Sequence, residues 1–479
     1  MDSVAPGMLP TRPLLPGDDN QRRAKQQALR MRLLRGRWME DLEKALRLHV
    51  REDRLGVWGI GEMSRNPFRS ISSQVGGALY HRPGELRGGD GVEDLSAAMQ
   101  AAGYWQVMQR QSTDLVGLRE TLMRVDWSER GGLLYRPIDP DACIVDAVPE
   151  APDEPAYLAE LQLREHPETK DPAWCWEILD IRDMAAPEHK IMDAKMEEDW
   201  TDEILGPAPD GSINGYRYVY DGKPFLPVVM HHAERTGELW DAFYGIETVL
   251  GTMTVAVLLT FWVHGVKDGS FATVLLVNGQ IRGVEIEGAD GTRRNVISTE
   301  PGSIIEVGPI EEGAGQPTAV QLQPGFDPQK LMLAITGFEQ GLAEFAGVSA
   351  ADLVRTGADP RSGVSLSISR EGLRDAQGRM EPQLRRGDLE AARVTAMMLN
   401  LHTGSDLPLD GVSITYPSLP LSIGERKAQT EDLTTKVDAG LMSMVDAYMA
   451  LHPGITRKQA TAELTRIRSE NALYASPNL

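Results

Sequence analysis

The chain alternates between stretches with a helical spacing of apolar residues and stretches typical of short strands. Apolar positions recur every three or four residues from about 20 to 55 and again over 92–125, which predicts two helical regions. Between 126 and 238, short apolar runs are separated by turns rich in Pro, Gly and Asp, which predicts antiparallel strands. The pattern therefore predicts an α+β protein whose first half forms a mixed body.

A long apolar stretch follows this body. The 16 residues 248–263, TVLGTMTVAVLLTFWV, contain no charge and continue an apolar pattern that begins near 239, so they predict a helix over 239–263. A membrane span needs about 20 strongly apolar residues, and this run contains four Thr and one Gly, so a buried helix is the better interpretation. Neighbouring segments do not predict enough apolar surface to cover it, so we expect copies of the chain to do so.

The second half of the chain predicts strands and then more helices. Asn278–Gly279 lies between two β-rich stretches, which is typical of a tight hairpin turn. Helical patterns follow over 327–348 and 363–402, and Pro382 predicts a kink or a break in the second. A short strand and a helical region from about 422 to 471 complete the pattern.

Composition and charge narrow the classes of function. At 479 residues, with 41% hydrophobic and 25% charged residues, the chain can form two or more domains. A net charge of −21 argues against general attraction to nucleic acid phosphates. Residues 20–37 are an exception, with seven Arg and Lys and no acid. They predict either a solvated helical arm or an arm that docks on an acidic neighbour or on nucleic acid.

The sequence lacks the motifs that would indicate catalysis. It contains no GxxxxGK[ST], GxGxxG, HExxH or CxxC motif. Cys143 and Cys175 lack metal-ligand spacing, so we expect structural thiols, as suits a reducing cytoplasm. His231 and His232 are adjacent in a predicted strand, so their side chains should point to opposite faces and not share one metal ion. We expect no enzyme activity, catalytic residue, metal or cofactor.

Four segments, read in this order, resemble the portal proteins of tailed bacteriophages and prophages. Residues 227–253 resemble the strand that leads into the first stem helix, and residues 322–354 resemble the second stem helix. Residues 355–373 are similar to the tunnel loop with the start of the long helix, and residues 436–471 are similar to C-terminal helices of that family. The resemblance covers roughly 225–471. The predicted all-β insertion departs from it, since portals commonly have an α/β clip.

The resemblance implies a fold and a division of the chain. The fold is a portal-like α+β wing body, with two long stem helices that flank a small β-rich clip. The implied parts are a disordered arm (1–19), the wing (20–238), stem helix 1 (239–265), the clip (266–325), stem helix 2 (326–350), the tunnel loop (351–363), the long kinked helix and strand of the wing (364–420), and a helical crown with the C-terminal tail (421–479).

The resemblance also implies a function and partners. Portal subunits form a ring, a dodecamer, at one capsid vertex, through which double-stranded DNA is packaged and ejected. The ring docks the terminase large subunit and then a head–tail adaptor, and it contacts the major capsid and scaffolding proteins. The implied location is the virion, after assembly in the host cytoplasm, with no membrane. The alternatives are another virion structural protein, such as a head–tail connector, and an enzyme of unknown class.

The same resemblance implies roles for particular residues. The subunit interface of the stem would include Val255, Leu258, Leu259, Trp262, Leu331 and Ile335. The tunnel loop would face DNA through Asp352, Arg355, Asp359 and Arg361. The clip would contact the adaptor or the terminase through Asn278, Gly279, Gln280 and Arg282.

Overall fold

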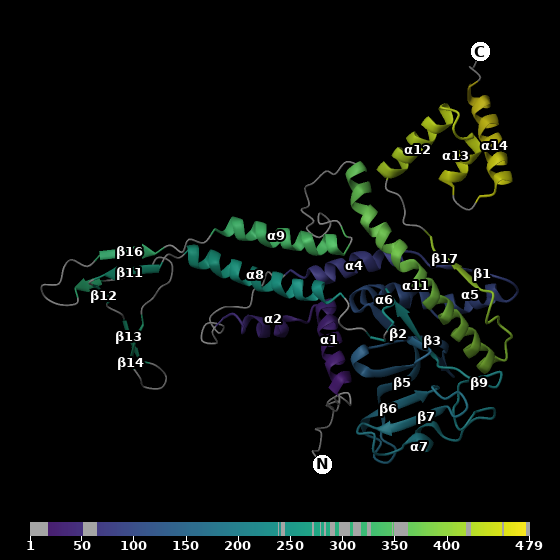
Figure 1. Ribbon diagram of the computed structural model, residues 1–479, viewed down its shortest axis with the longest axis horizontal. Helices are drawn as coiled ribbons and strands as arrows, with labels where there is room; N and C mark the ends of the chain where they lie inside the picture. The colour runs from purple at the N-terminus through teal and green to yellow at the C-terminus, as the bar shows by residue number, and fades with distance from the viewer. Residues whose placement is uncertain are drawn as a thin grey trace.

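The computed structural model describes residues 18–50, 65–237, 239–240, 245–270, 327–346, 348, 363–417, 423–452 and 455–475, and the backbone of six short strands between 273 and 322. Helices and antiparallel sheets are both present, which confirms the predicted α+β class. A mixed body carries a pair of helices that extends away from it and ends in the short strands, and three C-terminal helices lie at another edge (Figure 1).

The body combines helices with two antiparallel sheets. Its helices are α1 (Asp18–Arg35), α2 (Met39–Leu46), α4 (Pro67–Leu79), α5 (Val92–Ala101), α6 (Tyr104–Leu118), η1 (Pro140–Ala142) and α7 (Thr201–Leu205). One sheet has the order β10–β2–β3, from Val228–His232, Glu120–Ser128 and Gly132–Ile138. The other has the order β4–β5–β6–β7, from Cys143–Val148, Ala151–Glu165, Pro172–Asp180 and Glu188–Asp193. The pair β8 (Val219–Tyr220) and β9 (Lys223–Pro224) leads into β10.

The basic stretch docks on its own chain. Arg32 pairs with Asp41 at 2.7 Å, and Arg35 pairs with Asp139 at 3.0 Å. Arg23 donates to backbone carbonyl oxygens at η1 and at the start of β4. Of the two interpretations of residues 20–37, the structure therefore favours docking on an acidic neighbour, and that neighbour lies in the same chain.

The extended pair consists of α8 (Ile246–Ser270) and α9 (Pro328–Phe345). The prediction that the first of these helices begins at 239 is wrong. Trp240 and Gly245 have positive φ angles of 57° and 69°, which a right-handed helix does not accommodate. The Trp240 side chain is buried in the body, and its backbone N–H donates to a carboxylate oxygen of Glu120. Leu239 and Trp240 therefore belong to the body core and not to the helix.

The short strands form three antiparallel pairs that nest inside one another. They are β11 with β16 (Thr273–Val277, Thr318–Leu322), β12 with β15 (Gly279–Ile281, Val307–Pro309) and β13 with β14 (Val284–Glu287, Arg293–Val296). Val277 pairs with Thr318 and Gly279 pairs with Pro309, so the hairpin predicted at Asn278–Gly279 is wrong. Both flanking stretches pair with the returning chain, so a long-range ladder overrides the local turn preference.

The longest helix, α11 (Gly363–Thr403), runs unbroken through Pro382, so of the predicted kink or break the break is wrong. Met380 and Leu384 are buried on either side of the proline, and this core packing offsets the lost backbone hydrogen bond. After it, β17 (Ser413–Thr415) pairs with β1 (Glu85–Arg87). The C-terminal unit is formed by α12 (Ile423–Asp438), α13 (Met444–Leu451) and α14 (Arg457–Ala475).

Candidate subunit interface

The two extended helices pack closely against each other. A Cβ atom added at Gly251 of α8 would lie 2.5 Å from Cδ2 of Leu342 in α9, a distance that real side chains do not adopt. Gly251 therefore lets the two backbones approach, with Leu342 filling the space over it. At the far end, the indole N–H of Trp262 donates to the carbonyl oxygen of Pro328 at 2.8 Å, so both ends of the pair are tied.

Helices of the same chain cover much of α8. Besides α9, α8 contacts α2 and α4. Val255 and Leu259 are buried in the main core cluster, and the hydroxyl of Thr252 accepts a hydrogen bond from the Phe68 amide at the start of α4. The expectation that copies of the chain cover α8 therefore applies to only part of its surface, because α2 and α4, which precede it by more than 150 residues, fold against it.

By length and composition, α8 also qualifies as a membrane span. Residues Ile246–Val266 have a mean hydropathy of 1.8, and half of that window is buried inside the protein. It is the one such helix among the residues that the structure describes, which is weak evidence for a membrane, since core helices pass the same test. The hydroxyls of Thr254 and Thr260 donate to the carbonyls of Leu250 and Ala256, one turn earlier, so their polar groups are satisfied within the helix.

Helix α9 carries two parallel seams with the three- and four-residue spacing of helix–helix contacts. The inner seam faces the chain's own core, where Glu339 is ion-paired with Arg65 at 2.9 Å; it consists of Met332, Ile335, Glu339, Leu342 and Ala346. The outer seam is offset by one residue and lies largely in solvent; it consists of Leu331, Ala334, Phe338, Gly341 and Phe345. Phe345 is 67% exposed and Phe338 is 43% exposed. A second helix could therefore pack against α9 along the outer seam.

Two exposed glycines lie on the solvent side of α9. Among the residues that the structure describes, a Cβ added at Gly337 or Gly341 would meet no atom within 4 Å, and neither glycine has a positive φ. A glycine inside a helix costs about 1 kcal/mol relative to alanine. Glycine in such a position is typical of a close approach by another backbone.

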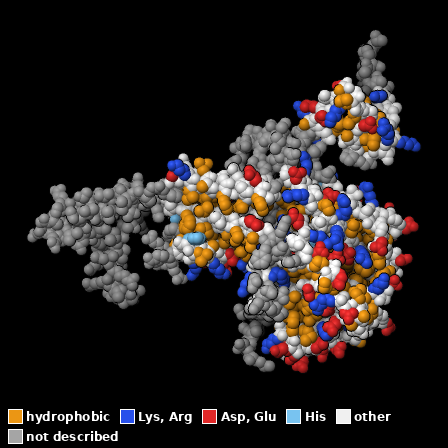
Figure 2. Space-filling view, viewed as in Figure 1, with side chains coloured by type: hydrophobic (Ala, Val, Ile, Leu, Met, Phe, Trp, Pro, Cys, Tyr) orange, Lys and Arg blue, Asp and Glu red, His pale blue; other side chains and the backbone are white. Residues whose placement is uncertain are grey.

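Helix α8 extends the same surface. Leu250 is 57% exposed and Thr254 is exposed, while Leu258 is half-buried at the edge of the cluster that also holds Leu331 of α9. Figure 2 shows hydrophobic side chains gathered over the described part of these two helices. We call the surface formed by the outer seam together with Leu250, Thr254 and Leu258 the stem face.

The predicted interface residues divide between this face and the core. Val255, Leu259 and Ile335 are covered by their own chain, so their side chains need no neighbouring subunit. Leu258 and Leu331 are half-buried members of the stem face, and Trp262 is half-buried at the far end of the helix pair. Sequence reasoning missed the residues that are most exposed on this face, Leu250, Phe338 and Phe345. The spacing of the outer seam was the signal that could have identified the two phenylalanines.

The other predicted site residues lie partly outside the described residues. Asp352, Arg355, Asp359 and Arg361 all lie there, as do Asn278 and Arg282. Gly279 and Gln280 belong to β12, of which the backbone is described. Their contacts with DNA, adaptor and terminase therefore stay predictions.

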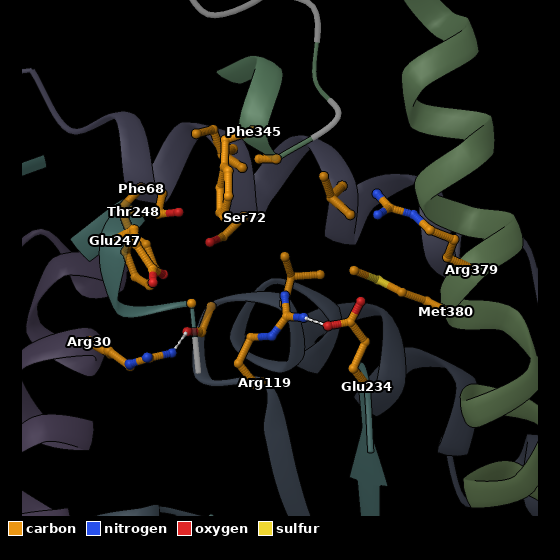
Figure 3. A pocket seen from close by; sticks show the side chains of 16 residues that line it. Arg30, Phe68, Ser72, Arg119, Glu234, Glu247, Thr248, Phe345, Arg379 and Met380 are labelled. Carbon is orange, nitrogen blue, oxygen red and sulfur yellow. Dashed lines mark hydrogen bonds and ion pairs between the residues drawn. The ribbon is translucent and has the colours of Figure 1, made fainter. Parts of the chain in front are cut away.

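A cavity of about 620 Å³ adjoins the stem face at the body end of the helix pair. Its lining includes buried apolar residues of α4, such as Phe68, and Met380 of α11. Arg119, from the junction of α6 and β2, is ion-paired with Glu234 in its wall, and Phe345 of α9 lies over it (Figure 3). Phe345 thus belongs to both the cavity and the stem face.

Charged groups lie deep in the body, away from the stem face. The guanidinium of Arg124 contacts Glu160 and Glu177 from the neighbouring sheet, and His189 lies 3.1 Å from Glu177. Burial alone would raise the pKa of Glu177, but Arg124, His189 and Arg164 together hold that pKa well below its usual range. This cluster joins the two sheets of the body, and its members gave no recognisable spacing in the sequence because they lie on four different strands.

Comparison with known proteins gives weak structural likenesses. No protein-family model matches the chain, and no curated protein matches it in sequence. A chain in the neck of an empty GTA particle, computed with C6 symmetry, is 12% identical with a TM-score of 0.37, over 85% of this chain and 95% of that one. A chain of the virion of a native gene transfer agent particle is 10% identical with a TM-score of 0.35, over 82% and 91%. TM-scores this low do not establish a shared fold.

Proposed function

We propose that this chain is the subunit of a portal ring, through which double-stranded DNA enters and leaves a capsid. The observation that carries the proposal is the stem face, an exposed apolar helix–helix surface whose seam contains Gly341. The order of elements resembles that of portal proteins, which suggests a portal ring as the assembly. The stem face supports the proposal because a ring needs a contact surface between neighbouring subunits.

A second copy of the chain is the occupant that suits the stem face best. Each fully buried leucine or phenylalanine contributes about 1.5–3 kcal/mol relative to full exposure, so covering Leu250, Phe338 and Phe345 would stabilise a contact substantially. Contacts that repeat head to tail around an axis form a closed ring when the rotation between neighbouring subunits divides a full turn evenly. The bare glycines of α9 permit the close backbone approach that such a contact uses.

The remaining parts take their roles from this arrangement. The strands β11 to β16 lie at the far end of the helix pair (Figure 1), where the proposal places terminase and later the head–tail adaptor. The loop at 351–363 would face the DNA, with Arg355 and Arg361 touching phosphates. Strong phosphate binding would hold the DNA by counterion release, so the net charge of −21 suits a channel along which DNA slides.

The test replaces Gly341 by leucine. No atom of the described residues lies within 4 Å of a Cβ at this exposed position, and leucine has a higher helix propensity than glycine, so the monomer should stay folded and melt no lower than the wild type. In a ring, the same side chain would push neighbouring helices apart. Light scattering and negative-stain imaging should therefore show wild-type rings and Gly341→Leu monomers.

Gly378→Leu is the matched control, because Gly378 is an exposed helical glycine of α11 with equal room for a Cβ. It should assemble like the wild type. If Gly341→Leu also forms rings of wild-type mass, the stem face is not the subunit contact. If the wild type forms no ring at any concentration tested, or if its rings have no central channel, the portal function itself is rejected.

A further inference from the structure

A fully buried carboxylate, Asp388 of α11, joins four elements of the body. Its oxygens accept hydrogen bonds from the hydroxyls of Tyr80 (3.1 and 3.2 Å), Tyr104 and Tyr416, and Nε2 of His231 lies 3.2 Å away. Asp388 and His231 are both 0% exposed. Burial, and next to it the charge of Asp388, raise the pKa of Tyr80 and Tyr104 well above the usual value, so both hydroxyls remain donors.

The contact between α11 and β10 depends on a glycine beside this carboxylate. A Cβ atom at Gly387 would lie 2.7 Å from Cδ2 of His231. The helix therefore approaches the strand closely at this point, and His231 cannot move without disturbing α11. A glycine at position 387 is therefore required by this contact.

The next histidine continues the chain of contacts on the opposite face of β10. His232 Nδ1 lies 2.8 Å from Oε1 of Glu120, and Nε2 lies 3.1 Å from the backbone carbonyl oxygen of Asp153. The other oxygen of Glu120 accepts the backbone N–H of Trp240, in the segment that leads to the start of α8. Both histidines are buried.

At its other end, this series of contacts reaches Tyr416, which precedes the C-terminal unit in the sequence. Tyr416 is half-buried, whereas Tyr80, Tyr104 and His231 are buried. It follows the three-residue strand β17 and precedes α12 by only six residues. Of the three tyrosines that donate to Asp388, Tyr416 can therefore lose its hydrogen bond most easily. It lies in the segment that leads to α12–α14.

We propose that Asp388, His231, His232 and Glu120 form a buried relay that couples the segment at 413–417, which leads to α12–α14, to the entry of α8. Tyr416 engages one end of the relay and Trp240 engages the other. Because the two histidines are neighbours on one strand but face opposite sides, a shift of β10 toward either side changes both contacts. The relay consists of two hydrogen-bonded groups, one around Asp388 and one around Glu120, that are joined through the backbone of β10 between His231 and His232. A contiguous physical connection of this kind can carry such coupling. It does not depend on the proposed function, since it uses no contact between subunits.

Hydrogen exchange with mass spectrometry tests the relay on the full chain. Tyr416→Phe removes one hydroxyl and leaves Asp388 with three other partners, so the chain should fold with nearly unchanged circular dichroism. We expect exchange to rise several-fold at 413–417 and also at 228–250. Ser413→Ala is the control, since it removes only the hydrogen bond from Ser413 to the Arg87 carbonyl. It should raise exchange only at β1 and β17.

The reverse experiment starts from the other end. Coupling between two sites is reciprocal, so Glu120→Gln, which keeps a carbonyl acceptor for Trp240, should raise exchange at 413–417 as well as at 228–250. If Tyr416→Phe alters only residues near 416, or if Glu120→Gln leaves 413–417 unchanged while it loosens 228–250, the two ends are not coupled and the relay is only a set of local packing contacts.

Discussion

Arg124→Met removes a guanidinium that lies between two buried carboxylates. In the wild type, Arg124 contacts Glu160 at 3.0 Å and Glu177 at 2.7 Å, and these three side chains are 4%, 4% and 2% exposed. It also contacts Asp126 at 2.6 Å. Methionine has a similar length and can fill the space, so the change tests the charge more than the packing.

The expected cost follows from what remains after the change. Breaking a buried ion pair by removing one partner costs about 3–5 kcal/mol, because the other charge stays buried. Glu160 keeps Arg136, and Glu177 keeps Arg164 and His189. We therefore expect the lower end of that range, about 3 kcal/mol.

The loss of stability caused by Arg124→Met should be smaller in acid than at neutral pH. The pKa of Glu177 is depressed in the folded chain, so its ionisation contributes stability above the unfolded pKa of about 4.3. That contribution is lost as the pH falls through the folded pKa. The difference in stability between wild type and Arg124→Met should thus be full at pH 7 and shrink below about pH 4.

The assay is denaturant unfolding followed by tryptophan fluorescence at several pH values. Arg182→Met is the control: Arg182 contacts Asp180 and Asp146, but it is 41% exposed. Exposed pairs contribute about 0–1 kcal/mol, so this control should unfold nearly like the wild type. A cost of Arg124→Met no larger than that of the control at pH 7, or a cost that persists unchanged in acid, would refute the role assigned to the buried cluster.

Three further predictions concern the helix pair. Gly251→Ala should force Leu342 aside. This overpacking costs about 1–3 kcal/mol and outweighs the gain in helix propensity of about 1 kcal/mol, so hydrogen exchange of the α9 amides should rise. Thr252→Val removes the acceptor of the Phe68 amide and should cost about 1–3 kcal/mol in thermal unfolding, whereas Thr254→Val on the exposed side should cost little. Trp262→Phe removes the bond to the first carbonyl of α9, about 1 kcal/mol, and should raise exchange at the far end of both helices.

Patterns that repeat along one element could be interpreted from the sequence. The period of apolar residues placed the start of α9 within one residue and its end within three residues of the observed bounds. The cap at Asp327, the proline after it and the inner seam all lie within one segment, so local spacing was enough. The adjacent histidines were correctly expected on opposite faces, since the alternation of a strand is a local property. The α+β class followed from the same two periods.

Features that depend on distant partners could not be predicted in this way. The relay at Asp388 and the cluster at Arg124 join residues from separate strands and helices, and a local pattern does not identify such partners. The same holds for the covering of α8 by α2, and for the pairing of the residues around Asn278 with strands that return 30 or more positions later.

The sequence by itself therefore determined the elements, their order and the apolar character of α8, because these depend on spacing within short stretches. Only the tertiary structure decided which apolar residues are covered. Ile335 and Leu331 are both apolar residues of one helix, yet the first is fully buried and the second is a half-buried member of the stem face. The direction from which α8 packs on α9 makes that difference, and this direction is set by Gly251, Leu342 and the body beneath them.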